Sequence, residues 1–430
     1  MNPFLGIAMM LAALAAVMGV AKFIGRFTAP EVTRKLAHVA MGLVMLALPW
    51  VFNSVWPVAA LCGGAIAALA AVRFWPPLRS RMGSVLGGVE RKTYGEFYFA
   101  AGILLLFILA RDDKILYCIP VLILALADTA GALVGTYYGM ARYRTDDGFK
   151  TAEGSLSFFT AAFLSCHVPL LLCTETGRAQ TLLISLTAGF TVMLLEAVVW
   201  HGQDNLIIPV AMYFLLELFL PLTVAELLVR FGVIVGFVLV ALAWRKRTTL
   251  SDSAVLVCAL SAYAVWGFWR WTWLIPLMLL FFIYVCLPRF HSTVRPMQNF
   301  HAVTQIMAGA FFWMLIPKVF PGADTFAPFI ICAAAHAANI ISSRLRAVRS
   351  HWTMRRICLI AWVVPVVIFG MFAVIISARV FWQLPVAVAL SLAAFIPLWP
   401  LDATERELHP ARRRFAETCV AVLASTIGCL

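Results

Sequence analysis

Long apolar runs separated by short polar segments recur from the first residues of the chain to the last. A helix needs roughly 20 residues to cross a hydrocarbon core of about 30 Å, and most of these runs approach that length. The runs lie at residues 4–25, 36–56, 57–74, 95–110, 115–139, 155–173, 179–200, 205–222, 224–244, 252–268, 271–288, 300–320, 326–343, 356–377, 381–400 and 415–430. Several are short, so the pattern predicts an all-α, polytopic integral membrane protein with about 14–16 transmembrane helices.

The composition supports the same class independently of the pattern. Hydrophobic residues make up 63% of the 430 residues, charged residues make up 12%, and the mean hydropathy is +0.94. These values exclude an ordinary soluble globular protein. No polar leader with a small-residue cleavage site precedes the first run, so we expect the first helix to be retained as a membrane span.

The basic residues divide unevenly between alternate loops. If the first helix runs inward, 25 of the 33 Lys and Arg residues fall in loops on one side of the membrane and 6 fall on the other. Cytoplasmic loops carry such an excess, so the net charge of +13 reports orientation, and we expect no nucleic-acid partner. The predicted location is a membrane such as the bacterial inner membrane, with the basic loops in the cytoplasm.

Acidic residues are few, and two of them fall inside predicted spans. Asp128 lies deep in the fifth span and Glu196 near the cytoplasmic end of the seventh, and Asp204 and Asn205 lie in the short loop that follows. An acid within a span is costly and is a functional candidate by default. The alternation of loops places the segment KTAEGS, residues 150–155, on the same side, so these groups are expected to converge on one membrane face.

These residue types suit phosphate chemistry that uses a metal ion. Asp128, Glu196 and Asp204 supply hard oxygen ligands of the kind that Mg²⁺ takes together with substrate phosphates. Lys150 supplies a point charge for a phosphate, and Ser155 begins a helix whose free N–H groups favour anions. The set predicts metal-assisted phosphoryl or nucleotidyl transfer at the membrane surface, in which one carboxylate could instead accept a proton.

The remaining candidates lie near the same groups. Gly154 would let a phosphate approach the main chain closely, and Glu153 would orient the site. Arg142 and Arg144 could contact a triphosphate or the anionic headgroups of membrane lipids. His38, just inside the second span, suits a structural hydrogen bond as well as catalysis.

Several of these residues also have a purely structural interpretation. Asp128 could be a buried polar group held by a neighbouring helix, and Lys150 could be one more positive-inside charge. Gly131, Gly135 and Gly139, at four-residue spacing, favour close helix packing over a phosphate cradle. Sequence alone leaves both interpretations open.

Four motifs follow one another in the first half of the chain: RKLAH at 34–38, ADTAG at 127–131, KTAEGS at 150–155, and Glu196 followed by Asp204, Asn205 and Pro209. Together they resemble the motifs of the CTP-dependent polyprenol kinases, a family that includes dolichol kinase and the phytol kinases and is related to the CDP-diacylglycerol synthases. The resemblance covers about residues 31–215. It implies CTP as phosphoryl donor, a lipid alcohol as acceptor and a divalent metal ion.

The resemblance and the residue chemistry together predict a lipid kinase that transfers a phosphoryl group from CTP to a polyprenol, phytol or similar isoprenoid alcohol at the cytoplasmic face of the membrane. The expected ligands of Mg²⁺, or of another divalent cation, are Asp128, Glu196 and Asp204. The expected catalytic residues are these three with Lys150 and Glu153. The residues expected to contact CTP are His38, Arg142, Arg144, Lys150, Gly154, Ser155 and Asn205.

Two alternative functions fit part of the same pattern. A phosphatidate cytidylyltransferase, which makes a CDP-lipid, would use the same nucleotide and metal. A non-enzymatic transporter or flippase would use the buried acids to bind ions or relay protons, and would favour paired acids in both halves. Only the first half carries an acidic cluster.

The second half differs in its polar residues. A span that begins near Pro328 aligns with the span that begins near Pro120, which indicates a decayed duplication. We expect residues 1–222 to form the catalytic membrane domain and residues 223–430 to be a degenerate duplicate or a scaffold. His336 is expected to make a hydrogen bond between helices and to have no catalytic role.

Overall fold

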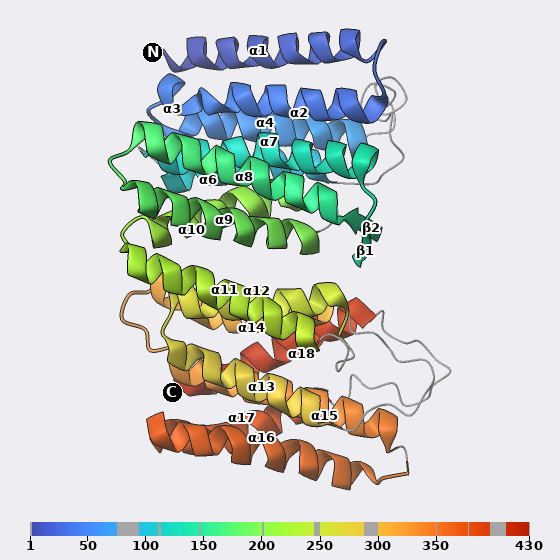
Figure 1. Cartoon of the computed structure of the whole chain (residues 1–430). Coiled ribbons are helices and arrows are strands. Elements are labelled where there is room, and N and C mark those ends of the chain that lie inside the picture. Colours follow the sequence, from blue (N-terminus) through green and yellow to red (C-terminus); the bar gives the residue numbers. More distant parts are fainter. Residues whose placement is uncertain are drawn as a thin grey trace. The chain divides into compact units, whose positions relative to one another are not determined.

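The computed structural model of the protein describes residues 2–74, 94–110, 113–145, 148–199, 202–244, 250–287, 300–349, 351–376, 378–395 and 410–429. The chain forms two compact units, Met1–Gly236 and Phe237–Leu430, here called unit 1 and unit 2 (Figure 1). The boundary lies inside helix α11 (Val224–Trp244), close to the division expected between residues 222 and 223. Both units are helical in their described parts, apart from one small β-hairpin in unit 1.

A helix lies on each predicted span of unit 1. These helices are α1 (Pro3–Ile24), α2 (Pro30–Leu46), the short α3 (Leu48–Val51), α4 (Val55–Phe74), α6 (Gly95–Ala110), α7 (Lys114–Tyr138), α8 (Ala152–Cys173), α9 (Arg178–Val198), α10 (Asp204–Phe219) and α11. Across the described parts of both units, nine helices are long and apolar enough to cross a membrane, and six more are apolar but shorter. The predicted fold class, an all-α polytopic membrane protein, is confirmed.

Unit 2 is built around one buried helix. Its helices are α12 (Asp252–Phe268), α13 (Leu274–Cys286), α14 (Phe300–Val319), α15 (Phe326–Val348), α16 (Met354–Ile376), α17 (Ala378–Phe395) and α18 (Pro410–Ser425). Helix α15 carries a row of buried alanines, including Ala334, Ala337 and Ala338, which pack in one core with residues of α13, α16 and α17. Small residues of this kind let membrane helices approach closely.

Helix α2 begins at Pro30, six residues before the predicted span. Proline is favoured in the first turn of a helix because its missing N–H would have no partner there. Glu31 in the same turn accepts a salt bridge of 2.6 Å from Arg34, one turn later. The polar start of α2 therefore belongs to the helix, and it carries Lys35 and His38 on consecutive turns.

A two-stranded antiparallel hairpin connects α7 and α8, and the sequence pattern did not predict it. Strand β1 (Arg142–Thr145) pairs with β2 (Gly148–Thr151) so that Tyr143 lies opposite Lys150. Gly148 has a φ of +129°, a backbone conformation that favours glycine. The Thr151 side chain then caps α8 by accepting a hydrogen bond of 3.1 Å from the Gly154 N–H.

Glycines form a close contact between the end of α7 and the start of α8. A Cβ atom on Gly154 would lie 2.9 Å from the carbonyl oxygen of Gly131 and 3.1 Å from the Cα of Gly135. A Cβ atom on Gly131 would in turn lie 3.1 Å from the Cβ of Phe158. The interpretation of Gly131 and Gly135 as a helix-packing face is therefore confirmed, and the contact fixes the hairpin against α7.

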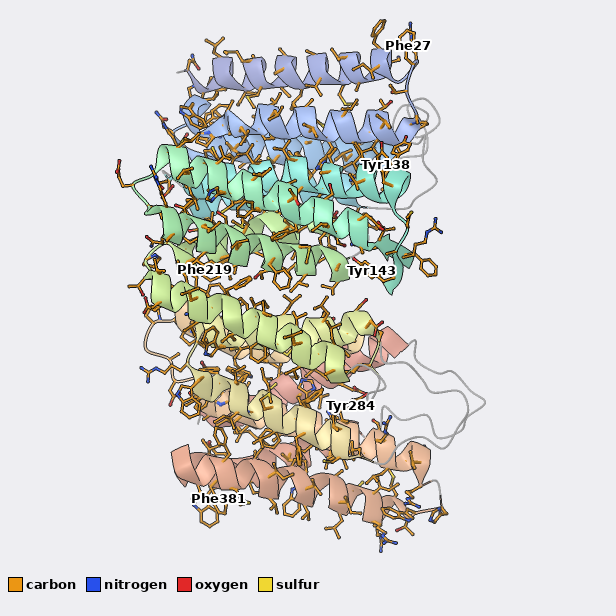
Figure 2. The ribbon with its side chains drawn as sticks, viewed as in Figure 1. Phe27, Tyr138, Tyr143, Phe219, Tyr284 and Phe381 are labelled. Carbon is orange, nitrogen blue, oxygen red and sulfur yellow. The ribbon has the colours of Figure 1, made fainter. Side chains whose placement is uncertain are left out.

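Loops alternate between the two ends of unit 1, as the predicted topology requires. Figure 2 shows Phe27, Tyr138 and Tyr143 at one end of the unit, after α1, at the end of α7 and on the hairpin. Phe219, at the end of α10, lies at the opposite end. The segments expected on one membrane face therefore do share one end of the helical unit.

Candidate active site

A buried ion pair connects α2 with α7. The ammonium group of Lys35 lies 2.7 Å from Oδ2 of Asp128, and the Lys35 residue is only 4% exposed. A Cβ atom on Gly42, two turns further along α2, would lie 2.5 Å from the Cβ of Ala125. The two helices therefore approach closely at this level. Removing one partner of such a buried pair typically costs about 3–5 kcal/mol, because the other charge is left uncompensated.

His38 lies beside this ion pair. Its Nε2 atom is 3.1 Å from the carbonyl oxygen of Leu124 and 3.6 Å from Oδ2 of Asp128. The ring of Phe99 packs edge-on against the imidazole, with 5.4 Å between the ring centroids. Because Leu124 and Asp128 are one turn apart on α7, His38 contacts the same face of that helix as Lys35.

A second ion pair connects the hairpin with α9. The ammonium group of Lys150, on β2, lies 2.7 Å from Oε1 of Glu196 and also donates to the backbone carbonyl of Glu196. Both side chains are partly buried. Tyr143, opposite Lys150 in the hairpin, shares a hydrogen bond of 2.7 Å with Ser155 in the first turn of α8. The hairpin is thus attached to α8 and α9 through polar side chains.

Asp204 and Asn205 begin α10 and lie close to the start of α6. The amide nitrogen of Asn205 donates a hydrogen bond of 3.0 Å to the carbonyl oxygen of Gly95. A Cβ on Gly102 would lie 2.4 Å from the Asn205 carbonyl oxygen, so only glycine permits this packing of α6 on α10. This contact places the first turn of α10 at the same end of unit 1 as the hairpin.

Asp204 joins the two ion pairs into one electrostatic group. Its carboxylate interacts electrostatically with Lys35 and Asp128 of the first pair and with Lys150 and Glu196 of the second. Its Oδ1 atom is buried and has no hydrogen-bond partner among the described residues. We call Lys35, Asp128, Lys150, Glu196 and Asp204 the charged cluster.

Three predicted site residues, Glu153, Gly154 and Ser155, make contacts within the protein that hold the hairpin and α8 in place. The Glu153 carboxylate accepts the backbone N–H of Ala141 at 3.1 and 3.2 Å, and so holds the base of the hairpin. Gly154 packs against α7, and its N–H donates a hydrogen bond to the Thr151 side chain. The Gly154 backbone is therefore not directed toward a phosphate. Ser155 is engaged with the Tyr143 hydroxyl.

The two candidate arginines lie on β1. Arg142 is exposed at the beginning of the strand. The backbone of Arg144 pairs with Phe149, but the side chain of Arg144 lies outside the described residues. Both positions belong to the hairpin that carries Lys150.

Lys35 is the member of the charged cluster that we did not predict from the sequence. By its position before the second apolar run, it is one of the positive-inside charges. A signal was available, since Lys35 lies three residues before His38 in the RKLAH motif and hence on the same face of a helix. Its partner Asp128 lies 93 residues away, so the pairing itself needed the structure.

The three predicted metal ligands do not surround one point. Within the described residues, no group of three or more His, Cys, Asp and Glu side chains is arranged to hold a metal ion. Mg²⁺ commonly uses one or two carboxylates and completes its shell with water and substrate phosphates. Asp204, whose Oδ1 has no hydrogen-bond partner among the described residues, interacts electrostatically with Asp128. These two carboxylates fit the number that Mg²⁺ takes from a protein.

Comparison with proteins of known function gives two relatives. The chain is 32% identical to the phytol kinase of Synechocystis sp. over 200 residues, which cover 46% of this chain and 83% of that protein. It is 28% identical over 218 residues to CTP-dependent diacylglycerol kinase 1 of Eremothecium gossypii, covering 43% of this chain and 65% of that protein. No family model matches the chain. No solved structure matches it either.

The match to the phytol kinase covers most of that enzyme and less than half of this chain. In the structure, the RKLAH and ADTAG motifs meet through Lys35 and Asp128, and the KTAEGS motif meets Glu196 through Lys150. Residues that the sequence presents as separate motifs are therefore paired side chains of one site. By its similarity over this length, the chain belongs to the family of CTP-dependent polyprenol and phytol kinases.

Proposed function

We propose that the protein is a CTP-dependent lipid kinase that transfers the γ-phosphoryl group of CTP to an isoprenoid alcohol such as phytol or a polyprenol. The observation that supports this most directly is the charged cluster, in which Asp204 interacts electrostatically with two lysines and two other carboxylates and has one oxygen without a hydrogen-bond partner among the described residues. Phosphoryl transfer depends mainly on positioning and on neutralising phosphate charge, and these residue types supply both.

The two ion pairs suggest how the site accepts a charged substrate. Without nucleotide, Lys35 and Lys150 neutralise Asp128 and Glu196, so the cluster does not hold isolated charges. When CTP binds, the ammonium groups turn toward its phosphates and release carboxylate oxygens. A bound Mg²⁺ would supply charge neutralisation for the phosphates, with Asp204 and Asp128 as its protein ligands and Glu196 as a third candidate.

The chemical step requires a proton acceptor. The alcohol oxygen forms a bond to the γ-phosphorus while the bond to the leaving oxygen of CDP breaks, and the hydroxyl proton passes to a carboxylate of the charged cluster. Asn205 and His38, fixed by Gly95 and Leu124, hold the neighbouring backbone in place. The lipid tail of the acceptor would lie among the apolar helices of unit 1.

Labelled CTP distinguishes this function from its alternatives. The purified protein would be incubated with Mg²⁺ and with phytol, a polyprenol, diacylglycerol or phosphatidate in separate reactions. We expect label from the γ-phosphate to enter an isoprenoid alcohol, and chelation by EDTA to abolish the transfer. Label from the cytidine entering phosphatidate would instead identify a cytidylyltransferase, and γ-label entering diacylglycerol alone would refute the isoprenoid substrate. Ion-driven uptake into liposomes without any transfer would favour a transporter.

The proposed cytoplasmic face of the site has a separate test. Variants that retain a single cysteine, either Arg142→Cys on the hairpin or the native Cys173, place a thiol at opposite ends of α8, and both positions are exposed. An impermeant thiol reagent added to intact cells should label Cys173 and should label the hairpin position only after lysis. The reverse pattern would place the charged cluster outside the cell.

A further inference from the structure

An apolar groove lies on unit 2. None of the residues that line it belongs to the charged cluster. It has a volume of about 260 Å³ and lies between α13, α15 and α16. Its walls include Phe282 of α13, Ile341 and Leu345 of α15, and Ile360 and Val364 of α16. All of these side chains are apolar, so the groove fits a hydrocarbon chain and offers no hydrogen bond to a polar ligand.

The groove has a defined direction along α16. Ile360, Val364 and Ile368 recur every four residues on one face of this helix and line the groove over about 12 Å. Trp352, in the loop between α15 and α16, also lines the groove and lies two residues before the start of α16. The volume is below the range of about 300–1,000 Å³ for pockets that enclose a ligand, so the groove would hold one part of one long chain.

Two arginines pack on the tryptophan that lines the groove. The guanidinium carbon of Arg356 lies 4.1 Å from the centroid of the Trp352 ring, and that of Arg349 lies 5.8 Å from it. On α15, Arg344 is mostly buried and lies 5.9 Å from the ring of Tyr284, on α13. Cation–π contacts of this kind hold guanidinium groups in place, whereas arginines that only report membrane orientation need no such support.

Acidic residues are absent from a long stretch of the sequence that contains these arginines. No Asp or Glu occurs between Asp324 and Asp402, whereas six arginines do. Guanidinium groups bind phosphate oxygens through paired hydrogen bonds. A phosphate monoester carries a charge of about −1.5 to −2 and three free oxygens, so it can use two guanidinium groups at once, whereas a phosphodiester carries one charge and two free oxygens.

We propose that unit 2 binds a single-chain lipid phosphate monoester, with its phosphate at Arg349 and Arg356 and its chain in the groove beyond Trp352. One groove matches one chain, and two ring-supported guanidinium groups match one dianionic headgroup. The biological identity of the ligand, a phosphorylated isoprenoid alcohol, rests on the function proposed for unit 1, because that reaction makes such a product. Unit 2 is then a product-binding site, which accounts for a second membrane unit that lacks an acidic cluster.

Photo-crosslinking of the full chain, without CTP, tests the binding site directly. The probe is an isoprenyl monophosphate with a diazirine at the end of its chain, added to purified protein in neutral phosphatidylcholine nanodiscs. We expect crosslinks in peptides of α13, α15 or α16 that line the groove. Unlabelled isoprenyl monophosphate should compete, and equal concentrations of the alcohol, phosphatidylglycerol or inorganic phosphate should not. Competition by phosphatidylglycerol would identify a site for bulk anionic lipid, and competition by inorganic phosphate would identify a simple anion site; either result overturns the proposal.

Matched variants then test each half of the site. The double change Arg349→Gln with Arg356→Gln should lower crosslinking at least about tenfold, while Arg355→Gln, a neighbouring change of the same charge, should leave it within about twofold. Val364→Trp, at a partly exposed wall position, should block the chain. Lipid phosphorylation by unit 1 reports whether each variant is folded. Crosslinks outside the groove in active protein overturn the inference alone, whereas specific crosslinks in protein without kinase activity overturn only the proposed function.

Discussion

The two units treat a polar residue at the same aligned position of a span differently. Asp128 on α7 is a carboxylate, and α2 supplies Lys35 as its counter-ion at 2.7 Å. The position that corresponds to it when the spans are aligned from Pro120 and Pro328 is His336 on α15, which is 4% exposed. At this contact the neighbouring helix α14 presents a glycine and not a cation. The residue is Gly309, on which a Cβ atom would lie 3.1 Å from Nε2 of His336.

This difference shows what a charged group inside a membrane helix requires. A carboxylate in a span needs a cation from a neighbouring helix, because a lone buried charge is far too costly. A neutral imidazole does not, and Nε2 of His336 has no hydrogen-bond partner among the described residues. Nε2 therefore does not form the hydrogen bond between helices that we expect of the His336 side chain. At the aligned positions, unit 1 has a carboxylate paired with a lysine, and unit 2 has a histidine with no such ion pair among the described residues.

Asp128→Asn is expected to have the largest effect. The change keeps the shape of the side chain but leaves Lys35 buried without a counter-ion and removes a proposed metal ligand. Turnover of γ-labelled CTP into lipid should fall by roughly 10³-fold or more. Glu175→Gln, an exposed change at the far end of α8, is the control and should be near wild type. Wild-type turnover in Asp128→Asn would make Asp128 and His336 equivalent, and the contrast between the units would disappear.

Lys150→Met should lower turnover by about 10²- to 10³-fold, because one positioned phosphate contact is lost while the length of the side chain is kept. Arg178→Met, at the exposed start of α9, removes the same charge at the opposite end of unit 1 and should have little effect. The rate is measured at saturating CTP and Mg²⁺.

A charge exchange sharpens this test. In the double variant Lys150→Glu with Glu196→Lys, the ion pair of 2.7 Å can form again with its ends reversed, but the ammonium group now lies on α9. If Lys150 contacts phosphate, the double variant should fold well and remain inactive. Recovery of activity would show that the pair serves the fold alone.

Glu153→Gln should have a small effect, within about threefold, because the amide oxygen of Gln can still accept the N–H of Ala141. Glu153→Ala, which removes that acceptor and releases the base of the hairpin, should be more damaging. Equal and severe losses in both variants would support the catalytic role that the sequence suggested for Glu153.

His336→Ala should change lipid phosphorylation least, within a few-fold after correction for expression. The imidazole lies in unit 2, and its Nε2 makes no hydrogen bond to a described residue that the change would break. Thermal unfolding in detergent would show whether the cavity left behind lowers stability. Loss of turnover in a well-folded His336→Ala protein would show that unit 2 takes part in the reaction.

The sequence was sufficient for the helices and for four of the five residues of the charged cluster. Acids inside apolar runs are conspicuous, so Asp128 and Glu196 could be found without a structure. Lys35 is less conspicuous, because its charge is shared with 24 other basic residues on the same predicted face and its partner is on another helix. Pairing between distant spans leaves no mark in the local pattern.

The hairpin explains the other differences from the expected site. Its strands are four residues each, too short for an alternating pattern to be distinguished from a polar loop. Without the hairpin, Glu153 has no visible partner in the sequence and resembles a free carboxylate. With it, Ala141 lies within hydrogen-bond distance, and Lys150 is directed to Glu196.

The glycine contact between α7 and α8 limits how the protein can be redesigned. Any side chain at Gly154 would collide with the Gly131 carbonyl, so even alanine would move the hairpin, and Lys150 with it, away from the helix that carries Asp128. Libraries that aim at a new lipid specificity should therefore leave these two glycines unchanged. Their diversity belongs on helix faces that contact lipid, where a larger side chain alters the acceptor without altering the spacing of the charges.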